Sequence, residues 1–243
     1  SHTAVGACET VRRCAEVIPN LSLDLIFGVP GQTLESWRRT LDTAICLPVS
    51  HISTYGLTYE SGTPFFTRRQ HGRLQPVTDD VEREMYLLTI RVLAEAGFEH
   101  YEVSNFARPG FRCRHNLVYW HADEFHAFGP GAARYLNGTR STNIKSVPRW
   151  ISAWNDRQEF AIQESETLSP EDRAREALML GLRLVEGFDV SQFELRFGCS
   201  VESLAAEALR LHLRDGMLQL NDGRLRLTSD GRLIADTIIA DFL

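Results

Sequence analysis

The chain has very little lysine and no closely spaced cysteines. Lys145 is its only lysine. The five cysteines form no CxxC or CxxxCxxC motif; they are Cys8, Cys14, Cys46, Cys113 and Cys199. Structural zinc sites and iron–sulfur clusters usually take their thiolates from such motifs. The sequence therefore predicts free, buried thiols and no metal site written in one local segment.

Long apolar runs and an excess of positive charge are also missing. No run approaches the roughly 18 apolar residues of a membrane span, and no signal-peptide pattern is present. The net charge of −6 argues against a general nucleic-acid binder. With 243 residues and 43% hydrophobic residues, the chain can bury a sizeable core. We expect a cytoplasmic protein with one large domain or two smaller ones.

Short apolar runs alternate with amphipathic segments in the first half of the chain. Residues 21–27 (LSLDLIF) read as a strand that is covered on both faces. Further strands are expected over residues 51–57 and 99–103, with helices over 33–46 and 78–97. This alternation predicts a parallel α/β architecture.

Asp24 interrupts the first apolar strand. A carboxylate is costly to bury without hydrogen-bond partners. In parallel α/β folds, polar groups near the carboxyl ends of strands usually face a ligand. Asp24 therefore either contacts a ligand or caps a neighbouring loop, and the residues alone leave both possibilities open.

The segment HNLVYW, residues 115–120, is the most informative in the chain. His115 and Tyr119 are four residues apart, so a helix would present both on one face. An imidazole and a phenol are both known axial ligands of haem iron, and Trp120 adds a flat apolar surface. The competing interpretation is an ordinary half-buried aromatic cluster.

Aromatic and basic residues surround this segment. Five aromatic residues would stack on a macrocycle: Phe106, Phe111, Trp120, Phe125 and Phe128. Three arginines would pair with its propionates: Arg108, Arg112 and Arg114. The alternative is that the aromatic residues form a core and the arginines a solvated face.

The last seventy residues read as helices followed by a hairpin. Helices are expected over residues 170–185, 190–196, 201–214 and 229–242, with a hairpin at Asn221-Asp222-Gly223. This is the outline of a winged helix. Residues 169–243 nevertheless hold nine arginines against thirteen acidic residues. Duplex binding depends on a basic surface, so the charge argues against DNA binding and favours a module that contacts a partner or caps the fold.

Four motifs in order resemble one family. They are DLIFGVPGQT (24–33), LT with GTPF (57–58 and 62–65), YEVSNFARPG (101–110) and HNLVYW. They resemble the radical S-adenosylmethionine (SAM) family of oxygen-independent coproporphyrinogen III oxidase and HemW-like haem chaperones, over essentially the whole chain. Within that family, HNxxYW is similar to the motif of the haem-chaperone branch.

The resemblance implies an α/β fold in two parts. A partial, TIM-like β/α barrel would hold a 4Fe–4S cluster and SAM, and a helical, winged-helix-like domain would follow. Residues 1–110 would be barrel, 111–168 a connecting segment with HNxxYW, and 169–243 the HemN-type C-terminal domain. The family's CxxxCxxC lies upstream of the region that corresponds to Ser1. We therefore expect a C-terminal portion that lacks roughly 150 residues.

Two properties follow from a barrel without its first strands. The chain alone would not bind the cluster in the family's way, and we do not expect radical catalysis from it. A partial sheet would expose an edge and an apolar face, so self-association is expected.

The resemblance also assigns residues. Asp24 matches the aspartate that binds the SAM ribose, and Thr58 falls where the family lines the adenine. His115 matches the motif histidine proposed to take part in haem binding, and Tyr119 and Trp120 match its partners, so we expect His115 to ligate the haem iron. The family often has a histidine after the GPGA turn, where this chain has Ala133-Arg134 after residues 129–132. His121 or His126 would have to take its place.

Three functions remain at this stage. The favoured one is a HemW-like haem chaperone, which binds haem and passes it to acceptor proteins. The second is coproporphyrinogen III oxidase, which decarboxylates two propionates through a SAM-derived radical. The third is a non-enzymatic winged-helix interaction module. The HNxxYW motif favours the haem chaperone over the oxidase. The acidic C-terminal domain disfavours a winged-helix module that binds DNA.

Overall fold

The computed structural model describes residues 3–156 and 161–243. The chain divides into two compact units, one up to Cys113 and one from Arg114 onward. Among the described residues, no helix is both long and apolar enough to cross a membrane.

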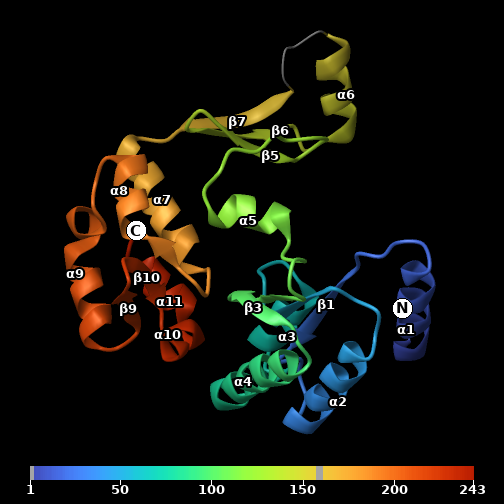
Figure 1. Ribbon diagram of the computed structural model, residues 1–243. Helices are drawn as coiled ribbons and strands as arrows, with labels where there is room; N and C mark the ends of the chain where they lie inside the picture. Colours follow the sequence, from blue (N-terminus) through green and yellow to red (C-terminus); the bar gives the residue numbers. More distant parts are fainter. Residues whose placement is uncertain (1–2, 157–160) are drawn as a thin grey trace. The chain divides into compact units, whose positions relative to one another are not determined.

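The first unit contains five of the elements that the sequence predicts and three more. In chain order they are α1 (Ala4–Ala15), β1 (Ser22–Phe27), α2 (Leu34–Ile45), β2 (His51–Gly56), α3 (Pro64–Gln70), α4 (Asp79–Glu95), β3 (Glu99–Glu102) and β4 (Asn105–Ala107) (Figure 1). Threonine side chains cap the helices: Thr33 accepts from the amide of Ser36 and Thr78 from that of Val81. Such caps satisfy amides that the first helical turn leaves open.

The sheet of this unit is mixed, not parallel throughout. Its strand order is β1-β2-β4-β3, with β1 parallel to β2 and β4 antiparallel to both of its neighbours. The prediction of a wholly parallel arrangement is therefore wrong at β4. The chain reverses directly after Glu102, and the returning residues insert between β2 and β3.

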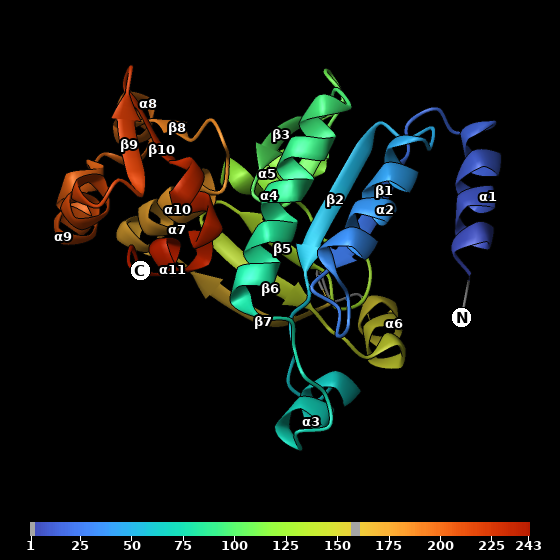
Figure 2. The same ribbon diagram turned by 90° about the horizontal axis from the view of Figure 1, so that it is seen from below.

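Strand β1 is covered on one face only. Leu23, Leu25 and Phe27 pack into the core, whereas Asp24 and Ile26 are exposed, Ile26 by 52%. The expectation of a strand covered on both faces is therefore not met. The two helices α2 and α4 lie along the same side of the sheet (Figure 2).

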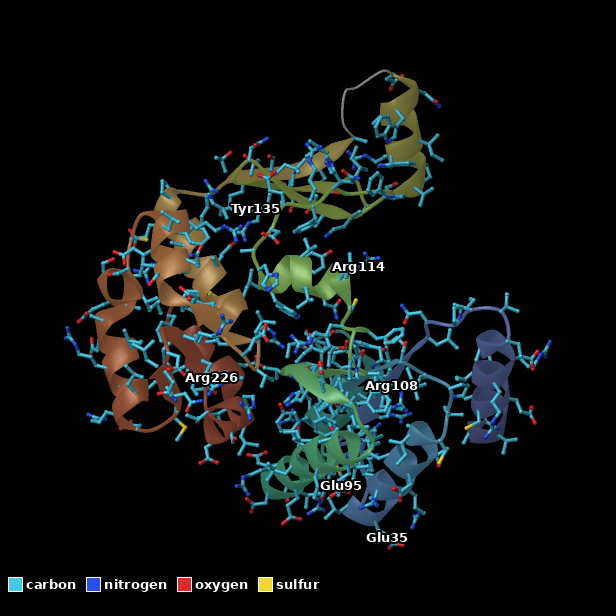
Figure 3. The ribbon with its side chains drawn as sticks, in the orientation of Figure 1. Glu35, Glu95, Arg108, Arg114, Tyr135 and Arg226 are labelled. Atoms are coloured by element: carbon cyan, nitrogen blue, oxygen red, sulfur yellow. The ribbon has the colours of Figure 1, made fainter. Side chains whose placement is uncertain are left out.

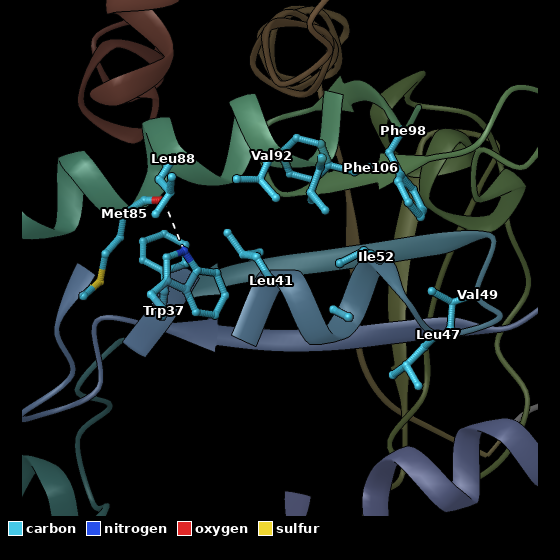
Figure 4. Packing of buried hydrophobic residues seen from close by; sticks show 13 residues of the cluster. Trp37, Leu41, Leu47, Val49, Ile52, Met85, Leu88, Val92, Phe98 and Phe106 are labelled. Atoms are coloured by element: carbon cyan, nitrogen blue, oxygen red, sulfur yellow. Dashed lines mark hydrogen bonds between the residues drawn. The ribbon is translucent and has the colours of Figure 1, made fainter. Parts of the chain in front are cut away.

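The core of the first unit lies between these helices and the sheet. Trp37 from α2 is fully buried, and its indole nitrogen donates to Oγ1 of Thr89 at 2.9 Å and to the carbonyl of Met85 at 3.2 Å (Figure 4). Charged side chains such as Glu35 and Glu95 project from the outer sides of α2 and α4 (Figure 3). A buried indole with its N–H satisfied fixes the register of α2 against α4.

The second unit contains all of the remaining elements. In chain order they are α5 (Arg114–Trp120), β5 (Ala133–Leu136), β6 (Thr139–Asn143), α6 (Val147–Asn155), β7 (Ile162–Thr167), α7 (Pro170–Leu182), β8 (Phe188–Asp189), α8 (Val190–Phe197), α9 (Val201–Arg214), β9 (Leu218–Asn221), β10 (Arg224–Leu227), α10 (Ser229–Leu233) and α11 (Ala235–Ala240).

Strands β5, β6 and β7 form an antiparallel sheet that the sequence analysis does not predict. The strands β6 (TRSTN) and β7 (IQESET) are mostly polar, so they lack the alternation that marks a half-buried strand. The turn between β5 and β6 is Asn137-Gly138, with positive φ at both residues. An Asn-Gly pair of this kind is a hairpin signal that could have been read.

The C-terminal part confirms the predicted hairpin. Its turn, Asp222-Gly223, has positive φ at both residues, and β10 pairs with β9 and with β8. The single final helix expected over residues 229–242 is wrong, because Ile234 leaves helical geometry (φ −125°, ψ 32°) and separates α10 from α11.

Candidate functional site

His115 and Tyr119 face each other on α5. The Tyr119 hydroxyl lies 3.1 Å from Nε2 of His115, and the two rings meet edge to face with 4.9 Å between their centres. The His115 side chain is exposed, and Tyr119 is half-buried. The helical spacing that the sequence predicts is confirmed, and the pair is accessible to a ligand.

The hydrogen bond between them has two forms. If the hydroxyl donates to Nε2, the proton of the imidazole is on Nδ1; if Nε2 donates to the hydroxyl, the lone pair is on Nδ1. A neutral imidazole offers one lone pair to a metal. In the first form the hydroxyl competes for that lone pair, and in the second form the lone pair is free.

Trp120 packs toward the C-terminal helices of its own unit. The guanidinium of Arg183 lies 4.8 Å from the centre of the Trp120 ring system, a cation–π contact. The indole nitrogen is buried and has no hydrogen-bond partner among the described residues. Tyr119 in turn packs edge to face on Phe125, at 4.6 Å between ring centres.

Arg196 on α8 holds the end of the motif helix. Its guanidinium donates to the carbonyls of His121 at 2.6 Å and Ala122 at 2.7 Å, and it pairs with Asp123 at 3.3 Å. Carbonyls at a helix C-terminus lack intrahelical partners and carry partial negative charge. Sequence reasoning missed this residue, because 75 positions separate Arg196 from His121.

Some of the residues predicted to surround a haem have other contacts in the structure. Phe106 has no exposed surface and belongs to the core of the first unit, so it has no face for a macrocycle. Arg108 lies over the Phe98 ring at 4.5 Å, and Arg112 pairs with Glu99 at 3.3 Å. Phe128, by contrast, is 87% exposed.

Asp24 and Thr58 are both exposed in the first unit. Asp24 is in register with Ser53 on the parallel strand β2, and Thr58 follows the end of that strand. The Asp24 carboxylate is therefore on the uncovered face and not buried among apolar side chains. This removes the burial cost that the sequence analysis assigns to it and leaves it open to a ligand.

Buried polar residues from β2, β3 and β4 lie on the same face of the sheet as Asp24. His51 is in hydrogen-bond contact with Tyr101 through Nε2 and with Ser22 through Nδ1, both at 2.8 Å. Burial lowers the pKa of His51, and the charge of Asp24 opposes that shift. The amide nitrogen of Asn105 donates to the carboxylate of the fully buried Glu102.

Glu82 lies at the carboxyl ends of β1 and β2, a position that sequence reasoning missed. A Cβ on Gly56 would be 2.6 Å from its Oε1, and Gly28 also lies against its carboxyl group. Burial raises the pKa of Glu82, and the nearby Asp79 adds to the shift. In the sequence, the glycines at the ends of these two neighbouring strands were the feature that could have indicated a close approach by another group.

The described residues do not suit an iron–sulfur cluster. Among them, no three His, Cys, Asp or Glu side chains gather into a group that would hold a metal ion. A cluster needs several thiolates around one point.

Comparisons with known proteins agree with the motifs. Residues 168–234 match the model of the HemN C-terminal domain. The chain is 33% identical to heme chaperone HemW of Bacillus subtilis over 92% of its own length, and 36% identical to heme chaperone HemW of Mycobacterium tuberculosis over 99%. It covers 59% and 58% of those proteins, so it spans about six tenths of their length.

A solved structure has the same fold. Coproporphyrinogen III oxidase (HemN) from Escherichia coli, described as a radical SAM enzyme, superposes with a TM-score of 0.77 at 20% identity. The match covers all of this chain and 59% of that one. At this identity the likeness shows an α/β fold of the HemN type.

The fold is thus that of the HemN-type group, residues 168–234 match that group's C-terminal domain, and the resemblance predicted from the motifs is confirmed. Within that group, the chain is similar in sequence to the heme chaperones named HemW over nearly its whole length.

Proposed function

We propose that this chain is part of a haem chaperone that binds haem on α5 and passes it to an acceptor protein. The observation that carries the proposal is the His115–Tyr119 pair, in which the imidazole is exposed. An accessible neutral imidazole is a suitable axial ligand for haem iron. The identity of 33–36% to proteins named heme chaperone supports the same function.

In this proposal, the residues of the motif have different roles. His115 ligates the iron. Tyr119 holds the imidazole through its hydroxyl, which also competes with the iron for the Nε2 lone pair, and its ring offers an aromatic edge. Trp120 contributes the apolar wall on which the macrocycle rests and, through Arg183, links the motif helix to the C-terminal helices.

The finer features of the resemblance are also proposals. Asp24 and Thr58 would contact SAM in the intact protein, and the exposure of both supports this. We keep residues 1–110 as part of a radical SAM barrel, 111–168 as the connecting segment and 169–243 as a winged-helix-like domain. The α7–α9 helices followed by the β9–β10 hairpin support the last assignment. The cytoplasmic location and self-association remain predictions.

The second candidate is coproporphyrinogen III oxidation. It is favoured by the likeness in fold to E. coli HemN. The two candidates predict different roles for His115. A chaperone needs an axial ligand for the haem iron, whereas an oxidase acts on an iron-free substrate and needs none. Only the chaperone proposal requires haem binding that depends on an imidazole.

Transfer tests the proposed function directly. The chain is loaded with one equivalent of haem, separated from free haem and mixed with apomyoglobin while the Soret band is followed. We expect the band to change to that of myoglobin, and we expect His115→Ala to retain clearly less haem than the wild type at the loading step. Haem that stays on the chain, or loading that is equal in both proteins, contradicts the proposal.

A further inference from the structure

A cavity opens in the second unit, between α6 and the sheet of β5, β6 and β7. Its volume is 390 Å³, within the usual range for small-molecule sites. His126, Phe128, Arg134, Trp150 and Trp154 are among the side chains that line it. Figure 1 shows α6 beside the end of this sheet.

The walls of this cavity are aromatic and unusually exposed. Trp150 and Trp154 lie one turn apart on α6 and meet edge to face at 5.9 Å between ring centres. Trp154 is 46% exposed and Phe128 is 87% exposed. Isolated apolar side chains on a surface need no explanation, but several large rings around one hollow mark a binding site. Rings of this kind suit a flat, apolar ligand.

His126 is available as a metal ligand. Four other histidines of the described chain use a ring nitrogen in a hydrogen bond; they are His51, His100, His115 and His212. For His126 the described residues provide no hydrogen-bond partner, and its ring lies 6.3 Å from that of Phe128. An exposed imidazole beside aromatic rings can bind an iron centre without first breaking a bond.

The charge at the cavity selects for an anion. Arg134 and His126 are the ionisable residues among the described lining, and no acidic residue is among them. The Nε of Arg134 donates to Ser141 at 2.7 Å, which fixes the side chain on the sheet. A fixed guanidinium next to an aromatic wall suits a flat ligand with carboxylates at its edge.

Another cavity of the unit lacks these properties. It has a volume of 360 Å³ and is also lined by a histidine, His121, but Asp123 and Asp189 lie in its wall. The guanidiniums of its arginines, Arg196 and Arg224, already donate to backbone carbonyls. Its two aspartates balance its two arginines, so it does not favour an anionic ligand.

We propose that the cavity between α6 and the β5–β7 sheet is a second site for an anionic metalloporphyrin, in which His126 binds the metal, Trp154 and Phe128 stack on the ring and Arg134 pairs with a carboxylate. This rests on the proposed function, because it takes haem as the ligand class. The cavity would be a site separate from the motif helix. It would hold a haem before or after His115 binds it.

Two probes separate ring stacking from metal ligation. Iron-free protoporphyrin IX reports stacking through its fluorescence, and haem reports iron ligation through its Soret band. The variants are Trp154→Ala and His126→Ala. Matched controls in the same unit are Leu195→Ala, which removes an apolar side chain that is 80% exposed, and His121→Ala, which removes the histidine of the other cavity.

We expect Trp154→Ala to weaken protoporphyrin binding about tenfold, the effect of one lost aromatic stacking contact. His126→Ala should leave protoporphyrin binding unchanged and remove one of two haem-binding phases, and the two controls should match the wild type. Wild-type behaviour of both pocket variants overturns this inference. If His115→Ala abolishes all haem binding and His126→Ala has no effect, the proposed function stands and the second site fails. If His126→Ala abolishes all haem binding and His115→Ala has no effect, the second site stands and haem binding at the motif helix fails.

Discussion

The hydroxyl of Tyr119 lies 3.1 Å from Nε2 of His115, one helical turn away on α5. The bond joins the two residues that the HNxxYW spacing places on one face, and it holds an exposed imidazole in one orientation. It also competes with any metal for the Nε2 lone pair when the hydroxyl is the donor.

From this geometry we expect Tyr119→Phe to strengthen haem binding. Loss of the hydroxyl frees Nε2, whereas the ring contact with Phe125 is kept. Because an exposed hydrogen bond contributes only about 0.5–1 kcal/mol, we expect haem to bind two- to five-fold more tightly. Tyr119→Ala, which also removes the ring, should bind more weakly than the wild type. If Tyr119→Phe loses haem binding as completely as His115→Ala, the phenol itself is the ligand.

Arg196→Lys should destabilise the second unit by about 1–2 kcal/mol. Lysine keeps the charge but has no planar fork to reach the carbonyls of His121 and Ala122 together. Urea unfolding followed by circular dichroism measures the difference. The matched control is Arg210→Lys in the exposed pair with Glu202, where we expect under about 0.5 kcal/mol. Equal effects at both positions would contradict a capping role for Arg196.

Gly187→Ala should destabilise the second unit by roughly 3 kcal/mol or more. Gly187 has φ +62°, and an added Cβ would be 2.0 Å from the carbonyl oxygen of Leu225. The control is Gly198→Ala, where φ is +73° but nothing lies within 4 Å of the added atom. There only the left-handed conformation opposes the substitution, at about 1 kcal/mol. Similar losses in urea midpoint would show that the contact with Leu225 does not matter.

The stability of the first unit should fall with acidification below neutral pH. Burial lowers the pKa of His51 from its ordinary value of 6.5, so the unfolded chain binds its proton more readily than the folded one. The contribution is complete above pH 6.5 and is lost as the pH falls below it, at no more than about 1.4 kcal/mol per pH unit. We expect His51→Gln to flatten the dependence of the melting temperature on pH. An unchanged slope would assign the effect to other groups.

The sequence predicts the elements that carry strong patterns. The apolar runs ending at Phe27 and near Gly56 become neighbouring parallel strands, and the Asp222-Gly223 pair forms the predicted turn. The sheet of β5, β6 and β7 has few apolar residues, so hydrophobic periodicity could not indicate it. The cavity beside α6 cannot be predicted for the same reason, because residues of this sheet form one of its walls.

Long-range contacts account for what the sequence could not predict at the site. The spacing in HNxxYW fixes the His115–Tyr119 pair because both residues lie on one helix. Arg183 reaches that helix from the end of α7 and Arg196 reaches it from α8, and no local pattern specifies such contacts. Phe106 was wrongly assigned to a ligand surface because proximity in sequence does not reveal that its ring is in the core of the other unit.

A haem titration of the whole chain beside His115→Ala tests the central claim most directly. Soret absorbance is followed at fixed protein concentration, circular dichroism confirms that both proteins are folded, and His71→Ala serves as an exposed-histidine control. We predict a saturable Soret shift in the wild type and in His71→Ala, with at least one phase weakened about tenfold or more in His115→Ala. The same titration curve in all three proteins would contradict iron binding at the motif helix.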